Sequence, residues 1–140
     1  MSDVLTNDDQ ELIEVARRTI TERYKENRHH IGSALRTKSG RIFTGVHLDT
    51  YVGRASVCAE AIAVGQAMTA GESDIETIVS VRHPRPRETY REIQVVSPCG
   101  ICREMLADFA PQCRVILPAE KGLAKPLVTE LLPNKYFRRT

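Results

Sequence analysis

The sequence predicts an α/β fold in which helices cover both faces of one mixed sheet. Three segments place apolar residues at helical spacing, and five short segments have the apolar runs or β-branched content of strands. Their order along the chain is helix, strand, strand, helix, strand, helix, strand, strand. Such an order is typical of a mixed sheet between helical layers. Because 140 residues can bury one core, we expect a single domain over residues 1–140.

The first part of the chain predicts a helix followed by a hairpin. Residues 7–24 carry apolar side chains at helical spacing, with Thr6 or Asn7 available as the N-cap and acidic residues in the first turn. Residues 31–36 and 41–46 are short apolar runs joined by a Lys-Ser-Gly turn, which suits two antiparallel strands.

The middle of the chain predicts a second helix, a buried strand and a long loop. Residues 58–70 are rich in alanine and end at Gly71, a typical residue after a helix. Residues 74–81 have the β-branched content of a core strand. Residues 82–94 are basic and interrupted by two prolines, so we expect a loop there.

The last part predicts one more helix and two strands. Pro98 precedes the third helix, whose segment CREMLADFA shows helical spacing up to Pro111. Residues 113–118 are expected to form a core strand, and residues 126–133 a final short strand.

Composition and charge narrow the classes of function. Apolar residues make up 41% and charged residues 27% of the chain, which is the balance of an ordinary folded domain. The formal net charge of +2 gives no bulk attraction to nucleic acid or membranes. The N-terminus lacks the pattern of a signal peptide, and no stretch approaches the roughly 18 apolar residues of a membrane span. We therefore expect a cytoplasmic protein whose partners are neither membranes nor nucleic acid.

Three of the four cysteines stand where a metal site can form. Cys58, Cys99 and Cys102 all fall near predicted helix starts, where the helix dipole favours the thiolate form that binds metals. Three thiolates suit zinc and leave one tetrahedral position for water. Cys113 lies eleven residues after Cys102, roughly 16 Å along a helix, which is too far to share the ion. Glu60, two residues after Cys58, is placed to exchange protons with that water.

The Cys-x-x-Cys spacing alone is compatible with several kinds of site. It also occurs in structural zinc half-sites, in thioredoxin-like redox pairs and as two inert buried thiols. A structural site would need a fourth ligand, and a redox pair would not account for Cys58 or Glu60.

The paired segments CAE at 58–60 and SPCGICRE at 97–104 resemble the zinc signature of the cytidine deaminase superfamily in its three-cysteine form. The segments IGSALRTKSGRIFTGV and TELLPNKY are similar to the first hairpin and the C-terminal segment of small nucleoside deaminases, and GRIFTGV and ELLPNKY resemble those of blasticidin S deaminase. The resemblance implies a three-layer α/β/α sandwich around a five-stranded mixed sheet, bound Zn²⁺ and a homotetramer.

The resemblance also implies roles for individual residues. Cys58, Cys99 and Cys102 would bind zinc, and Glu60 would carry protons from water to the cytosine ring and the departing amine. Arg54 or Arg103 would compensate the charge of the thiolates, since Ala61 stands where relatives often have arginine. The substrate-binding residues it implies are His29, Phe43, His47, Asp49, Ala59 and Tyr136.

Two of these positions put ordinary cytidine in question. Relatives hold the ribose hydroxyls with an Asn-x-Glu pair, for which this chain has His47 and Asp49. The 82–94 loop is longer than the corresponding loop of the relatives that this chain resembles. Its arginines either contact an acidic group on the substrate or belong to an ordinary solvated loop.

The leading hypothesis is zinc-dependent hydrolytic deamination of a free cytosine nucleoside or a close analogue. The alternatives are detoxification of the antibiotic blasticidin S and a noncatalytic, zinc-stabilised binding module.

Overall fold

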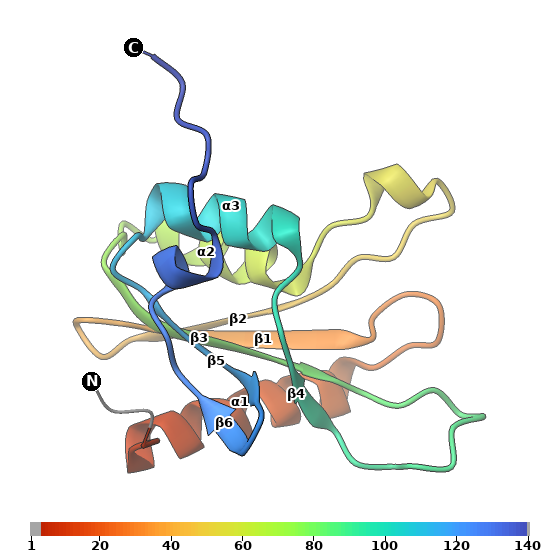
Figure 1. The fold of residues 1–140 in the computed structure, drawn as a ribbon. Helices are drawn as coiled ribbons and strands as arrows, with labels where there is room; N and C mark the ends of the chain where they lie inside the picture. Colours follow the sequence, from red (N-terminus) through yellow and green to blue (C-terminus); the bar gives the residue numbers. More distant parts are fainter. Residues whose placement is uncertain (1–3, 140) are drawn as a thin grey trace.

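A mixed sheet separates one helix from a pair of helices, as Figure 1 shows. The computed structural model describes residues 4–139. Helix α1 covers one face of the sheet, whereas α2 and α3 lie side by side on the other (Figure 1). Each face has its own buried apolar cluster, so the predicted sheet between helical layers is confirmed.

Helix α1 spans Asn7–Arg23 and confirms the first predicted element. The backbone N–H of Asp9 donates to the Thr6 hydroxyl over 3.1 Å, and the N–H of Thr6 donates to the Asp9 carboxylate over 2.9 Å. This capping box fixes the start of the helix. The buried face of α1 packs on the sheet through Leu12, Ile13, Ala16 and Ile20.

The predicted hairpin forms from β1 (Ile31–Thr37) and β2 (Ile42–Val46), which pair antiparallel. Gly40 in the turn has a φ of +94°, a left-handed conformation that glycine adopts without strain.

Strand β3 (Ile75–Arg82) is the centre of the sheet. One edge pairs antiparallel with β1 along its whole length. The other edge pairs in parallel with β5 (Arg114–Ala119) and, near its end, antiparallel with β4 (Gln94–Val96). The main path of the sheet is β2-β1-β3-β5-β6, where β6 spans Gly122–Ala124.

Two short strands differ from the sequence prediction. Gln94, predicted as loop, begins β4, and β6 follows β5 directly as an antiparallel partner. The predicted strand over residues 126–133 is wrong, because Val128–Leu131 forms a 3₁₀ helix. The sheet therefore has six strands rather than five.

Helices α2 (Ala59–Thr69) and α3 (Gly100–Phe109) confirm the other two predicted helices. A short 3₁₀ helix, η1 (Gly53–Ala55), precedes α2. Helix α2 approaches β2 closely at Gly45, where an added Cβ would lie 2.7 Å from the carbonyl oxygen of Ala59. Over residues 4–139, no helix is long and apolar enough to cross a membrane.

Candidate metal centre and active site

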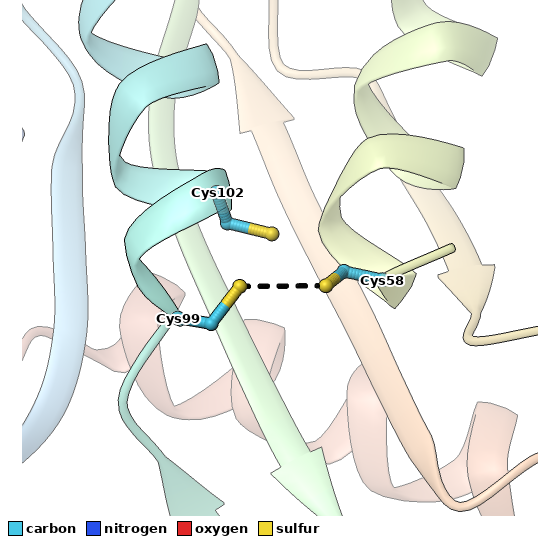
Figure 2. Close-up of side chains that lie close together, drawn as sticks. All are labelled: Cys58, Cys99 and Cys102. Atoms are coloured by element: carbon cyan, nitrogen blue, oxygen red, sulfur yellow. Dashed lines mark hydrogen bonds between the residues drawn. The ribbon is translucent and has the colours of Figure 1, made fainter. Parts of the chain in front are cut away.

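The start of α2 and the start of α3 bring three cysteine sulfurs together. Cys58 and Cys99 are the N-cap residues of these helices, and Cys102 lies in the first turn of α3. In Figure 2 the three sulfurs point toward one another between the two helices. The Sγ atoms of Cys58 and Cys99 are 3.5 Å apart, and all three sulfurs lie within 4.8 Å of one another.

These distances fit a single zinc ion. Tetrahedral zinc with Zn–S bonds of about 2.3 Å separates its sulfurs by about 3.8 Å. Among the described residues, no further His, Cys, Asp or Glu joins this group. Cys113 is buried in the core and its thiol donates to the Arg114 carbonyl oxygen, so it stands outside the site as predicted. Three sulfur ligands leave a coordination position for water, which favours a catalytic over a structural site.

The environment gives the four thiols different acidities. Burial would raise the pKa of Cys99, but N–H donation from Cys102 and hydrogen bonds from the neighbouring thiols outweigh it and lower that pKa. Burial raises the pKa of Cys58 and Cys102, and the negative charge of Glu60 adds to the effect at both. Burial also raises the pKa of Cys113 to about 12. A bound cation would offset the cost of thiolates at Cys58 and Cys102.

Glu60 lies in the first turn of α2, on the wall of a cavity beside the cysteines. Its side chain is largely buried, with 5% of the residue exposed. The cavity holds about 280 Å³ and is also lined by Cys58 and Cys99. Within the described part of the chain, the Glu60 carboxylate forms no hydrogen bond or ion pair. The carboxylate is therefore available to a ligand in this cavity.

The other walls of the cavity combine apolar and polar groups. Ala59 and His47, both predicted from the resemblance, lie on them. The sequence reasoning missed Ile31, Val96 and Ser97. Ser97 could have been found, because it begins the SPC segment that carries Cys99. Ile31 and Val96 carry no chemical signal, and only the pairing of β1 and β4 with β3 brings them to the cavity.

Two further predicted residues surround His47 without lining the cavity. Nδ1 of His29 donates to the His47 carbonyl oxygen over 2.8 Å. Asp49 lies in the following loop, where its N–H donates to the Arg28 carbonyl oxygen and its carboxylate accepts a long hydrogen bond from Ser56. Burial, followed by the nearby His30 ring, lowers the pKa of His47.

Phe43 and Tyr136 are not brought to the cavity wall. Phe43 is buried in the core beneath α2 and α3. Tyr136 is 78% exposed and lines a separate groove beside α3 together with Phe137. Within one chain these two residues are therefore separate from the cysteine site.

The two candidate charge-compensating arginines have different surroundings. Arg103 donates to the carbonyl oxygens of Pro98 and Leu131 over 3.0 and 3.2 Å, which ties the segment before Cys99 to the C-terminal part of the chain. Arg54 is exposed in η1.

The arginines of the 82–94 loop are largely held by protein groups. Arg82 forms an ion pair with Glu88, and Arg85 donates to Asn27 and pairs with Glu26. Arg91 donates to carbonyl oxygens within the same loop. These contacts engage three of the four arginines of the loop.

Comparison with known proteins identifies the family. Residues 6–117 match the model of the cytidine and deoxycytidylate deaminase zinc-binding region. The chain is 50% identical to blasticidin-S deaminase of Bacillus cereus over 134 residues, 96% of each protein. It is 29% identical to cytidine deaminase of Halalkalibacterium halodurans over 112 residues, 79% of each.

A solved structure extends the likeness to the fold. The cytidine deaminase of Bacillus anthracis aligns with a TM-score of 0.77 and 25% identity, over 93% of this chain and 90% of that one. The chain thus belongs to the zinc-binding family of cytidine and deoxycytidylate deaminases.

Proposed function

We propose that this chain catalyses hydrolytic deamination of the cytosine ring in a nucleoside substrate, with zinc held by Cys58, Cys99 and Cys102. The observation that carries the proposal is the position of Glu60 on the same cavity wall as two of these cysteines. A structural zinc site or a redox pair would need no unpartnered carboxylate beside the sulfurs.

The reaction exchanges the ring amine for a carbonyl oxygen. When bound, zinc supplies a Lewis acid that makes water an effective nucleophile near neutral pH. Glu60 accepts one proton from the attacking water and delivers it to the ring nitrogen. It then transfers the second proton to the amine, which leaves as ammonia. Ile31, Ala59 and Val96 give the cavity an apolar lining, and an apolar environment strengthens these electrostatic interactions.

Two kinds of substrate within this class call for direct comparison. Cytidine and deoxycytidine are the substrates that the general family likeness suggests. Blasticidin S is favoured by the 50% identity to blasticidin-S deaminase over nearly the full length of both proteins. The presence of His47 and Asp49 in place of an Asn-x-Glu pair also favours a substrate other than ordinary cytidine.

The test is release of ammonia from the zinc-loaded protein with cytidine, deoxycytidine, cytosine and blasticidin S. Glu60→Gln keeps the size of the side chain and removes its basicity, so we expect zinc retention with a rate at least about 100-fold lower. An inactive wild-type protein on the whole panel would overturn the proposal. A Glu60→Gln variant as active as wild type would overturn the role of Glu60.

We also propose that the protein is a cytoplasmic homotetramer. Support comes from the exposed aromatic side chains of Phe109, Tyr136 and Phe137 around the groove beside α3, an arrangement typical of a contact surface. Light scattering coupled to size-exclusion chromatography tests the proposal, and a monomer at micromolar concentration would contradict it.

A further inference from the structure

Arg103 directly follows Cys102 in the first turn of α3 and contacts the backbone on both sides of Cys99. Its half-buried side chain folds back toward the start of the helix, where Nε donates to the carbonyl oxygen of the buried Pro98 over 3.0 Å. Its backbone N–H donates to the Cys99 carbonyl oxygen, also over 3.0 Å. Because each peptide unit is planar, these two bonds restrain the planes before and after the Cα atom of Cys99. The direction of the Cys99 side chain is restrained with them.

The start of α3 lacks the usual side-chain cap. Cys99 is the N-cap residue, with a φ of −71° and a ψ of 170°, and its side chain forms no capping hydrogen bond. A serine, threonine, asparagine or aspartate at this position would hold the first turn through its own side-chain oxygen. The Cys99 sulfur instead lies 3.5 Å from that of Cys58, in the sulfur cluster. The Arg103 side chain therefore provides a restraint at the helix start that an ordinary N-cap residue would provide itself.

The same guanidinium group reaches the C-terminal 3₁₀ helix, Val128–Leu131. Nη1 of Arg103 donates to the Leu131 carbonyl oxygen over 3.2 Å. Because the group is planar and rigid, the bond to Leu131 also orients the bond to Pro98. Within residues 4–139, the guanidinium group forms no hydrogen bond with a cysteine sulfur. Its contacts join two backbone segments and do not place its charge on the thiolates.

We propose that Arg103 is a positioning residue, which orients Cys99 for metal binding by joining the Pro98–Cys99 backbone to the C-terminal 3₁₀ helix. This inference rests on the proposed function, in which Cys99 binds zinc. It gives residues 128–131, which follow the cysteines in the chain and contribute no ligand, a part in forming the metal site. Replacing a residue that orients a metal ligand commonly lowers metal affinity by about 10- to 100-fold.

Two variants separate positioning from charge compensation. Arg103→Lys keeps the positive charge but cannot form both bonds with the fixed geometry of a guanidinium group, and Arg103→Met removes the charge and the donors together. Positioning predicts that both variants lower zinc affinity by about 10- to 100-fold, measured by competition with a chromophoric chelator. Charge compensation predicts that Arg103→Lys keeps wild-type affinity.

Glu104→Gln is the matched control on the next residue of α3. Glu104 forms an ion pair with Lys135 and does not hold the Cys99 backbone, so zinc affinity should stay at the wild-type value. The absorption spectrum of the cobalt-substituted protein is a second readout, which a purely structural role would not move, because it reports the arrangement of the ligands around the ion. The spectrum of Arg103→Lys should differ from that of the wild type, and the spectrum of Glu104→Gln should match it.

A measurement on the wild type covers the case in which the Arg103 variants do not fold. By NMR, Nε–H of Arg103 should exchange with water more slowly than Nε–H of the exposed Arg54. Equal exchange rates, or an Arg103→Lys variant with wild-type zinc affinity and cobalt spectrum, would overturn the inference. None of these readouts requires turnover. Zinc binding without ammonia release by the wild type would instead overturn the proposed function, and the role of Arg103 in placing Cys99 would stand.

Discussion

Gly45 on β2 is the point at which helix α2 rests on the sheet. An added Cβ would lie 2.7 Å from the carbonyl oxygen of Ala59, 2.7 Å from the backbone nitrogen of Ala63 and 2.9 Å from Cβ of Ile62. The first two of these atoms belong to the helix backbone and cannot rotate away. Gly45→Ala therefore has to move the first turn of α2 away from β2.

The required displacement follows from these contacts. Ordinary van der Waals contact begins near 3.4 Å, so the helix backbone must shift by about 0.7 Å. Overpacking of this kind costs about 2 to 3 kcal/mol. For a chain of this size, that cost lowers the melting temperature by about 6–12 °C. Cys58 directly precedes the displaced turn, and metal sites tolerate only about 0.2 Å in ligand distance, so zinc affinity should fall as well.

Gly65→Ala in the same helix is the matched control. Gly65 has open space around an added Cβ, and alanine is a better helix former than glycine. We expect Gly65→Ala to leave zinc affinity unchanged and to raise stability by about 0.5 to 1 kcal/mol.

The two variants should be compared by urea unfolding and by competition for zinc with a chromophoric chelator. Opposite signs of the stability change are the expected result. If Gly45→Ala kept wild-type stability and zinc affinity, the close packing of α2 on β2 would not be what positions Cys58.

Two further predictions concern the metal and the acid stability. Cys99 belongs to the sulfur cluster and Cys113 does not. After dialysis, Cys99→Ala should therefore have lost the zinc that the wild type retains, whereas Cys113→Ala should keep about one zinc per chain, as measured by atomic absorption. Equal zinc content in the two variants would contradict this assignment. Burial would raise the pKa of Asp9, but hydrogen bonds from Lys125, Thr6 and Arg36 outweigh it and lower that pKa below 3.8. The stability contributed by the Asp9 carboxylate is therefore fully present above about pH 4 and is lost as the pH falls through the lowered pKa. Asp9→Asn should destabilise the protein by about 3 kcal/mol at pH 7. In urea titrations at pH 2–7, the variant should also lose less stability than the wild type as the pH falls. An unchanged pH dependence of the unfolding free energy would exclude the role of Asp9.

The sequence was sufficient to predict those helices and strands whose apolar side chains follow a regular pattern over several turns or residue pairs. Helix α1 shows its apolar face and its cap in the same segment, and the hairpin shows two runs separated by a turn. The three cysteines could be predicted to converge because each stands near a helix start. The spacing of Glu60 from Cys58 predicted a proton-transfer role beside the metal, and the family resemblance added the details of that role.

The sequence prediction missed two strands and assigned the wrong structure to residues 126–133, and both errors have physical reasons. Strands β4 and β6 are three residues each, too short to show an alternating pattern. Residues 126–133 have the apolar content of a strand, but their pairing with β5 is a single antiparallel bridge between Leu127 and Arg114. The Glu130 carboxylate then accepts from the Leu127 N–H over 3.0 Å and favours a helical turn instead.

The hydrogen bonds of the His47 ring are a different kind of omission. Nδ1 of His47 accepts from the backbone N–H groups of His30 and Ile31, which the β1–β2 pairing brings to the ring. No pattern of residue types records which ring nitrogen these groups reach.

Cys58 and Cys99 are 41 residues apart in the chain and 3.5 Å apart in space. An ion held by both would close this long loop, and an unfolded chain seldom presents such ligands together. Metal uptake and folding are then thermodynamically linked, so that each favours the other. A substitution that destabilises either helix, even far from the sulfurs, would therefore lower the affinity for the metal. A low concentration of the ion would in turn lower the population of folded enzyme.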